Sequence, residues 1–341
     1  MTGHKRLMGV ILTAVLVAAF TAPAAAEQKK IRWKFASLAP DGVGYARQIK
    51  KILFPVVEEV TEGNLELKVY WGGVMGDDED YIKKMRIGQL DGAGFSGQGT
   101  TLACPEMAVV ELPFLFKNYA EVDYIKSKMR DQFDKIIADN GYMALSWTDQ
   151  DFDQLYSTKY PLNNLEAFKR ARFLTWYGPL EEALFIALGA SPIPVSVPEA
   201  SASLRQGVVD AAIGPAIWVV GAQMYSTVKF VYPIKIRYSP AVILISLESW
   251  KELPKKYVDE LFAMRPELEA KYCAEVRKDN KKCLEAIIRY GVREGKINSA
   301  DLKEIKKRAK TIWYEKAGEL YPKKTLDELI SYLEEYRKAN G

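Results

Sequence analysis

Short strand-like runs alternate with helical stretches along the first two thirds of the chain, and this alternation limits the possible folds more than any other feature. Residues 31–36 and 65–70 alternate apolar and polar side chains with the period of two that is typical of a half-buried strand. Residues 45–61, between them, repeat apolar side chains at helical spacing. Strands that alternate with helices favour mostly parallel sheets covered by helices. We therefore predict an α/β protein.

The same patterns place further elements along the chain. Strands are expected at 92–96, 142–147, 154–157, 171–175, 210–213 and 241–245. Helices are expected at 78–87, 120–140, 180–188, 197–206 and 218–227. From Pro254 onward the pattern is helical, with a long amphipathic stretch at 257–294. No repeat or Gly/Ser linker interrupts the sequence, so any lobes are joined by ordered strands.

The N-terminus has the pattern of a secretory signal peptide. Lys5 and Arg6 precede an apolar run over 7–20, and small residues then lead to an A-x-A cleavage pattern before Glu27. The run is shorter than the roughly 20 residues that span a bilayer, although an uncleaved anchor is the alternative. We predict that residues 1–26 are removed and that the mature chain lies in the periplasm, with no direct membrane insertion.

Histidine, cysteine and charge content exclude several function classes. The single histidine, His4, lies within the predicted signal, so the mature chain has no Ser-His-Asp triad, Cys-His dyad or histidine-ligated metal. Cys273 and Cys283 fall in one predicted helix, about 15 Å apart along its axis, which is too far for a disulfide. The formal net charge of +4 gives no strong attraction to nucleic acid. We expect no enzymatic activity, no metal, no cofactor and no nucleic-acid partner.

Short motifs along the chain occur in an order that is typical of one family. They occupy 69–76, 85–92, 105–106, 111–116, 187–194 and 204–210. In the first, Gly72-Gly73-Val74-Met75-Gly76 resembles a Gly-Gly-x-Leu-Gly turn, with Met75 where leucine is usual. Over about 31–338, the order and spacing of the motifs resemble those of the substrate-binding subunits of TRAP transporters, the DctP family.

The resemblance implies a type II periplasmic-binding fold, in which two α/β lobes joined by hinge strands and a long helix close over a ligand. Lobe I is expected at 27–150 plus 236–265, lobe II at 151–235, and C-terminal helices at 266–341 pack across them. The resemblance also implies a small organic acid as ligand and, as partners, TRAP membrane subunits driven by an ion gradient. A sensory protein that presents its ligand to a receptor kinase is the alternative.

An arginine in lobe II is the family's central ligand contact, and the resemblance places it at Arg172. Its planar guanidinium suits two parallel hydrogen bonds to a carboxylate. Arg172 lies in a predicted strand after Ala171 and is expected to point into the cleft. An ordinary surface salt bridge is the alternative. The spacing to Gly189 is about two residues longer than usual, which leaves Arg170 or a shifted register open.

Three departures from the family pattern concern the ligand. Gly214 stands where an asparagine commonly reaches the ligand, and Asp153 stands where a second arginine is common. The loop after Arg172 gains an aromatic pair, Trp176-Tyr177. Together these changes remove one positive charge and one amide and add aromatic surface. They favour a monocarboxylate with an apolar or aromatic body over a dicarboxylate.

Further candidates complete the predicted site. Trp147 and Trp218 join Trp176 as candidate aromatic walls, although core packing is the alternative for each. Asp149 and Asp153 are candidates to receive a ligand amine, which would make this an amino-acid binder; solvated loop residues are the alternative.

In lobe I, a loop of small residues follows the strand at 92–96. Ser96 and Gln98 belong to it, and its glycines let backbone N–H groups approach a ligand. A plain loop is the alternative.

Overall fold

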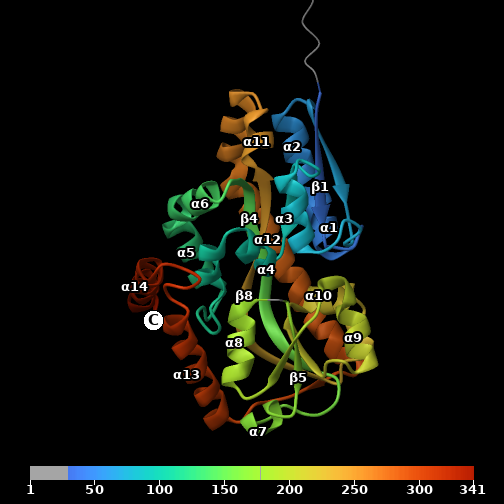
Figure 1. The fold of residues 1–341 in the computed structure, drawn as a ribbon, viewed down its shortest axis with the longest axis vertical. Helices are drawn as coiled ribbons and strands as arrows, with labels where there is room; N and C mark the ends of the chain where they lie inside the picture. The colour runs from blue at the N-terminus through green and yellow to red at the C-terminus, as the bar shows by residue number, and fades with distance from the viewer. Residues whose placement is uncertain (1–29, 177) are drawn as a thin grey trace, which may run out of the picture.

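A computed structural model describes residues 30–176 and 178–341, so the predicted signal peptide and Tyr177 lie outside the described residues. One mixed sheet runs through the described chain. Its strands are β1 (Ile31–Ser37), β2 (Leu65–Tyr70), β3 (Gly92–Phe95), β4 (Tyr142–Ser157), β5 (Arg172–Thr175), β6 (Ser191–Pro194), β7 (Ala211–Gly214), β8 (Phe230–Ser246) and β9 (Arg293–Glu294). Their order is β2-β1-β3-β8-β4-β7-β5-β6, with β9 beside β8. The strands β1 to β3 form one half of the sheet, called lobe I, and β5 to β7 form the other, called lobe II (Figure 1).

Helices cover each half of the sheet, as the α/β prediction requires. In lobe I they are α1 (Gly44–Gln48), a π-helix (Ile49–Leu53), α2 (Phe54–Val60), α3 (Asp78–Arg86), α4 (Gly97–Ala103), a 3₁₀ helix (Pro105–Glu111), α5 (Tyr119–Lys128), α6 (Arg130–Asp139) and α11 (Leu247–Lys251). In lobe II they are α7 (Leu165–Phe168), α8 (Pro179–Ala187), a 3₁₀ helix (Val197–Glu199), α9 (Ala200–Gln206), α10 (Ala216–Gly221) and a second 3₁₀ helix (Met224–Ser226).

Two long strands, β4 and β8, cross between the lobes. They pair antiparallel from Tyr142 opposite Ser246 to Ser157 opposite Phe230. The sequence pattern predicts two short strands at 142–147 and 154–157 in place of β4, and only 241–245 of β8. The polar middle of β4 breaks the apolar alternation and hides its continuity. The predicted preference for parallel pairing holds within each lobe, where β1 pairs with β2 and β3, and β5 pairs with β6 and β7. The crossing strands pair antiparallel: β8 with β3 and β4, and β4 with β7.

The predicted lobe limits at 150/151 and 235/236 fall inside β4 and β8, which belong to both halves of the sheet. The exact division therefore stays a prediction. Beyond the sheet, α12 (Lys255–Tyr290) runs along both lobes and packs on β4 and α10 (Figure 1). Cys273 and Cys283 both lie on it and are free thiols, as their spacing predicted.

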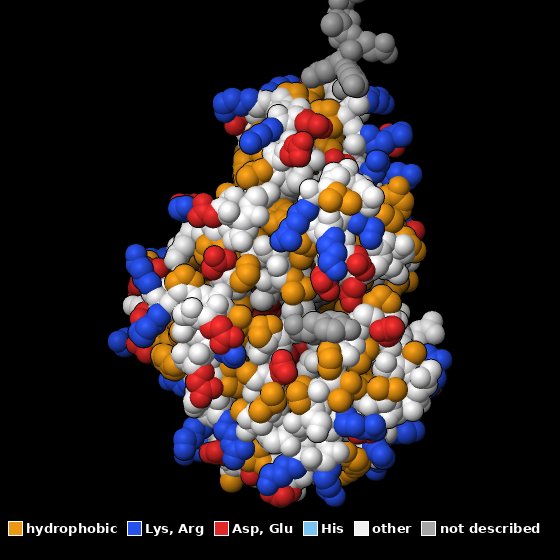
Figure 2. Space-filling model, viewed as in Figure 1, with side chains coloured by type: hydrophobic (Ala, Val, Ile, Leu, Met, Phe, Trp, Pro, Cys, Tyr) orange, Lys and Arg blue, Asp and Glu red, His pale blue; other side chains and the backbone are white. Residues whose placement is uncertain are grey.

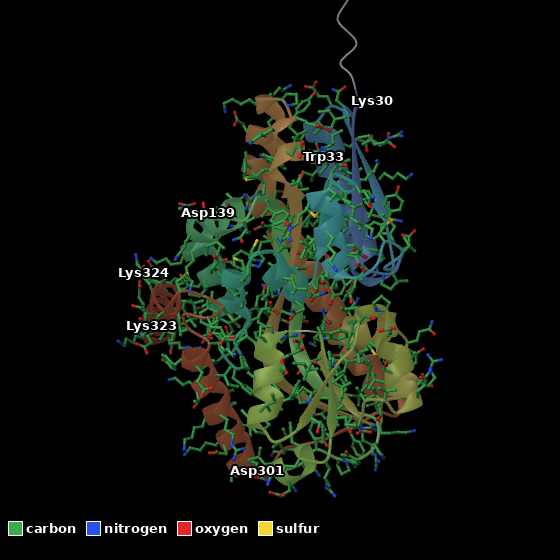
Figure 3. The ribbon with its side chains drawn as sticks, in the orientation of Figure 1. Lys30, Trp33, Asp139, Asp301, Lys323 and Lys324 are labelled. Atoms are coloured by element: carbon green, nitrogen blue, oxygen red, sulfur yellow. The ribbon has the colours of Figure 1, made fainter. Side chains whose placement is uncertain are left out.

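The last two helices, α13 (Ser299–Glu315) and α14 (Lys323–Asn340), pack along one side of both lobes (Figure 1). Asp301, near the start of α13, lies at the end of lobe II, and Trp33 of lobe I lies toward the opposite end of the molecule (Figure 3). Its carboxylate accepts a hydrogen bond from the backbone N–H of Leu165 at 3.2 Å, which ties α13 to lobe II. Arg337 of α14 donates to Glu121 of α5 and so ties α14 to lobe I.

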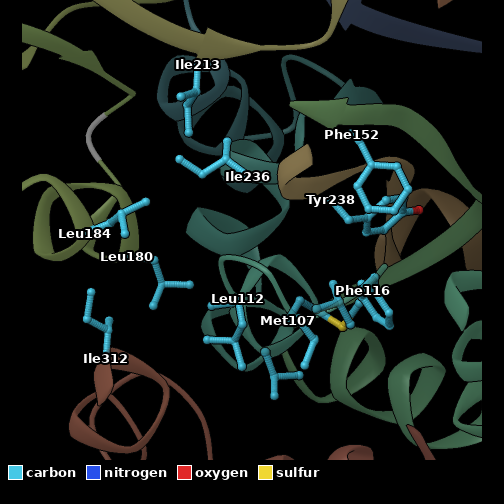
Figure 4. Close-up of a cluster of buried hydrophobic side chains, with 14 of the residues drawn as sticks. Met107, Leu112, Phe116, Phe152, Leu180, Leu184, Ile213, Ile236, Tyr238 and Ile312 are labelled. Atoms are coloured by element: carbon cyan, nitrogen blue, oxygen red, sulfur yellow. The ribbon is translucent and has the colours of Figure 1, made fainter. Parts of the chain in front are cut away.

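The largest apolar cluster is continuous from lobe I through the crossing strands to lobe II. Figure 4 shows Leu112 and Phe116 of lobe I, Tyr238 of β8, Leu184 of α8 and Ile312 of α13 within it. All are at most 4% exposed. Burial on this scale makes the hydrophobic effect the main stabilising contribution to the junction.

The outer surface in Figure 2 carries acidic and basic side chains interspersed over both lobes, without a continuous patch of either sign on that face. Among the described helices, none is both long and apolar enough to span a bilayer.

Candidate functional site

A cavity of about 380 Å³ lies between the lobes and is lined by both of them and by the crossing strands. Lobe I contributes, among others, Ser37, Tyr45, Ser96 and Gln98; the crossing strands contribute Ser146, Thr148, Gln150, Asp153, Arg237 and Ser239; lobe II contributes Trp176, Val197, Pro198, Gly214 and Trp218. The size suits a ligand of small-molecule dimensions.

The course of β4 decides which of its side chains reach the cavity. Alternate side chains of a strand point to opposite faces, and Ser146, Thr148 and Gln150 line the cavity in this way. A register shift against β8 lies between Asp149 and Asp151, where Asp151 has a φ of 138°. An irregularity of this kind changes which face the later side chains occupy. Asp153 therefore lines the cavity together with Gln150, three residues before it.

Two of the predicted site residues, Trp147 and Asp149, do not line the cavity. Trp147 is 1% exposed and packs edge-on against Phe133, with ring centroids 4.9 Å apart. Asp149 is fully buried, 2.6 Å from Arg277 Nε, and accepts a hydrogen bond from the Tyr238 hydroxyl at 2.6 Å. Both stand on the opposite face of β4 from Ser146, Thr148 and Gln150, so alternation along the strand removes them from the cleft.

Arg172 also stands outside the cavity, contrary to the expectation that it points into the cleft. Its Nε and one Nη donate hydrogen bonds to the carboxylate of Asp210, each at 2.9 Å, and Nη2 also donates to the carbonyl of Gly207 at 2.7 Å. The side chain is 42% exposed. Residue 172 is the first of β5, and its pairing with Asp210 holds the guanidinium at the surface. Arg170 is exposed and lies over the ring of Tyr160 instead.

A different arginine, Arg237 of β8, lines the cavity. It lies opposite Asp153 in the β4·β8 ladder, and its Nε donates to Asp153 Oδ2 at 2.7 Å. Its Nη2 is 3.1 Å from Glu181 of α8, and its Nη1 is 3.9 Å from Glu111 of lobe I. Only 7% of the side chain is exposed. One signal in the sequence points to Arg237: it is the single arginine of the run 230–246, which alternates apolar residues as a buried strand does.

The carboxyl groups around Arg237 are buried and share one cation. Burial raises the pKa of Glu111 to about 7 and that of Glu181 to about 7, and the nearby charge of Arg237 opposes both shifts. Burial likewise raises the pKa of Asp153 against the same arginine. Thr101 donates to Glu111 at 2.8 Å, and the backbone of Trp176 donates to Glu181 at 2.9 Å. The cluster therefore joins a lobe I carboxyl and a lobe II carboxyl through one guanidinium.

An indole pair forms the lobe II wall of the cavity. Trp176 and Trp218 meet edge to face, with ring centroids 4.7 Å apart, and both line the cavity as the sequence analysis expected. Gly214 makes the arrangement possible, because a β-carbon there would stand 2.5 Å from Trp218 Cε3. The residue that lacks a side chain for the ligand thus leaves room for an aromatic ring.

Ser96 and Gln98 bring lobe I to the cavity. Ser96 caps α4 by accepting a hydrogen bond from the backbone of Gly99 at 3.0 Å, and its hydroxyl donates to Asp78. Gln98 is 9% exposed and reaches across to Gly178 of lobe II. A β-carbon at position 178 would clash with the Gln98 amide, so only glycine leaves room for this contact. Gln98 Nε2 has no hydrogen-bond partner among the described residues. Of the predicted residues, the structure brings together Ser96, Gln98, Asp153, Trp176, Gly214 and Trp218.

Comparison with known proteins agrees with this architecture. Residues 45–319 match the family model of bacterial extracellular solute-binding protein, family 7, DctP. A solute-binding protein of Chromohalobacter salexigens is 27% identical over 59% of this chain and 60% of its own length. The 2,3-diketo-L-gulonate-binding periplasmic protein of Escherichia coli is 23% identical over 70% of this chain and 73% of its own length.

Solved structures extend the agreement to nearly the whole chain. A sugar acid binding protein of Advenella mimigardefordensis, in complex with galactonate, superposes with a TM-score of 0.83 at 18% identity, over 90% of this chain and 99% of its own. A TRAP periplasmic solute-binding protein of Desulfovibrio salexigens, with bound orotic acid, superposes with a TM-score of 0.77 at 21% identity, over 90% and 98%. At such identities the likeness establishes the fold, which is the two-lobed type II periplasmic-binding fold.

Proposed function

The chain belongs to the DctP family of bacterial extracellular solute-binding proteins, and we propose that it captures a small organic acid between its lobes and delivers it to the membrane subunits of a TRAP transporter. Members of this family bind solutes and are not enzymes. The proposed location is the periplasm, in agreement with the periplasmic relatives and with the signal-like N-terminal sequence.

The main observation behind this proposal is the position of Arg237 in the cavity. Its guanidinium lines the cavity, is almost fully buried, and donates only one hydrogen bond to a described residue, through Nε to Asp153. Both Nη groups carry further N–H donors, and a guanidinium binds a carboxylate through two parallel hydrogen bonds. We propose Arg237 as the carboxylate contact in place of Arg172.

The walls of the cavity support a ligand with one carboxylate and an apolar or aromatic body. Among the described lining residues, Arg237 is the single cation and Asp153 the single anion. A second carboxylate on the ligand would have no basic partner there. Trp176 and Trp218 offer aromatic surface to the rest of the ligand, and burial of such surface supplies affinity.

Capture is coupled to lobe closure because the site draws on both lobes. Arg237 lies between Glu111 of lobe I and Glu181 of lobe II, so a ligand bound at its guanidinium lies close to a carboxyl group of each lobe. A second contact between the lobes is the hydrogen bond that the Val197 backbone N–H of lobe II donates to Asp77 of lobe I at 3.1 Å. Hinge closure around a ligand is a common transition in two-lobed binding proteins. The closed, loaded form is the species proposed to dock on the membrane subunits.

A thermal-shift screen of organic acids tests the proposal. Monocarboxylates with apolar or aromatic bodies are expected to raise the melting temperature more than C4-dicarboxylates, because a ligand that binds only the folded state stabilises it. A larger shift with succinate or malate would refute the monocarboxylate assignment. A screen in which no organic acid shifts the transition or gives heat in calorimetry would refute the receptor function itself.

A further inference from the structure

The charges around the cavity are unbalanced for a simple anion. Arg237 is the one cation of its cluster among the described residues, and it faces Asp153 at 2.7 Å, Glu181 at 3.1 Å and Glu111 at 3.9 Å. Even with Glu111 and Glu181 protonated, Asp153 already neutralises Arg237. A bare carboxylate bound at Arg237 would then leave an uncompensated negative charge in a buried site, which is costly.

The hydrogen-bonding groups of the cavity are also of both kinds. Gln98 Nε2 is a buried donor and Asp153 Oδ1 is a buried acceptor, and neither has a hydrogen-bond partner among the described residues. Both side chains line the cavity, and the Asp153 side chain is 1% exposed. Buried polar atoms are nearly always paired in a functional complex. The cavity therefore offers a donor to a ligand oxygen and a charged acceptor to a ligand N–H or O–H.

From these two observations we infer that the ligand carries a cationic nitrogen beside its carboxylate, as an α-amino acid with an apolar or aromatic side chain does. Arg237 and Gln98 donate to the carboxylate, and Asp153 Oδ1 accepts from the ammonium group. The ligand then adds no net charge to the cluster. This inference rests on the proposed function, since it names the class of acid bound at the same site.

Calorimetry with matched ligand series tests the inference on the unaltered protein. One series is L-phenylalanine, (S)-3-phenyllactate and 3-phenylpropionate; the second is L-leucine, (S)-2-hydroxyisocaproate and 4-methylpentanoate. Within a series only the ammonium group is exchanged for a hydroxyl or for hydrogen. The amino acid is expected to bind at least about 30-fold more tightly than its hydroxy and deoxy analogues in at least one series, the ratio typical of a buried charge pair.

The variant Asp153→Asn removes the negative charge and keeps the shape of the side chain. It is expected to reduce the preference for the amino acid to about threefold or less, and Asp131→Asn, at an exposed aspartate on α6, is expected to leave the preference unchanged. If Asp153→Asn does not fold, the ligand series on the unaltered protein still decides the question.

Equal or tighter binding of a hydroxy or deoxy acid would overturn the inference. So would the absence of binding by both series when another organic acid binds, an outcome that leaves the proposed receptor function standing. If no organic acid of any kind binds, the proposed function fails and the inference fails with it.

Discussion

Replacing Arg237 by glutamine removes the guanidinium that holds three buried carboxyl groups at the junction of the lobes. The matched control is Arg172→Gln, which removes a guanidinium that lies outside the cavity and is 42% exposed. The two variants lose the same charge and side chains of the same kind. They differ in whether the arginine lies in the cleft, and so they separate the position found in the structure from the one expected from the sequence.

The structure assigns very different free energies to the two changes. Removing one partner of a buried ion pair costs about 3–5 kcal/mol of folding stability, and Arg237 is 7% exposed with Asp153 1% exposed. The guanidinium of Arg172 is 42% exposed although its partner Asp210 is 4% exposed, so solvent screening reduces the value of this pair to about 1 kcal/mol. Affinity for an organic acid should fall by about 2–5 kcal/mol in Arg237→Gln, since the ligand carboxylate loses its buried partner.

Urea unfolding at pH 8 and at pH 5.5 measures the stability of both variants, and calorimetry with the acid of largest thermal shift measures affinity. The cost of Arg237→Gln should shrink at pH 5.5, because Glu111 and Glu181, whose pKa values lie at about 7 with the arginine present, then take up protons. Arg172→Gln should bind the acid as the unaltered protein does. Comparable losses of affinity in the two variants, or a loss in Arg172→Gln alone, would refute the assignment of the carboxylate contact.

Two further predictions concern the aromatic wall and the effect of pH. Gly214→Ala should lower the unfolding free energy by about 1–3 kcal/mol and alter tryptophan fluorescence, because its β-carbon displaces Trp218. Gly221→Ala, at a residue of α10 that also lines the cavity but has no atom within 4 Å of an added β-carbon, should leave the fluorescence unchanged and should not lower stability. An unshifted spectrum for Gly214→Ala would contradict the packing. Stability should rise as the pH falls from 8 to 5, by about 2 kcal/mol from Asp78 alone, because burial raises its folded-state pKa to about 7 and such a group stabilises the protein only below that value. Urea titrations across this range check the sign, and Asp78→Asn should reduce the slope without abolishing it, because Glu111 and Glu181 contribute in the same direction.

Most of the secondary structure within the lobes followed from local patterns. The expected strands at 31–36 and 65–70 correspond to β1 and β2, and the expected helix at 180–188 corresponds to α8 (Pro179–Ala187). These elements bury one face and expose the other, so the period of the side chains records the fold. The crossing strands were predicted only in part, because the middle of β4 buries charged residues that a one-dimensional hydrophobic pattern interprets as loop.

The predicted site residues also separate into those that local sequence marked and those that depend on tertiary contacts. The family pattern marked Gly214, and Trp176 and Trp218 were candidate aromatic walls; the structure brings the three to the cavity because each lies at or shortly after a strand end in lobe II, where loops converge. The family resemblance favoured Arg172, and Arg237 was missed because its one local signal in the sequence is a lone arginine in an apolar run. Its partners Glu111, Asp153 and Glu181 come from three distant segments.

By itself, then, the sequence determined the family, the α/β class and the absence of histidine from the predicted mature chain. These features depend on composition, on local periodicity or on motif order, all of which exist along one dimension. Only the tertiary structure decided which charges meet. Alternation along β4 keeps Asp149 away from the cavity, and the shift in register against β8 between Asp149 and Asp151 turns Asp153 toward Arg237. Such a shift depends on pairing with a distant strand, in which Arg237, 84 residues later in the chain, lies opposite Asp153.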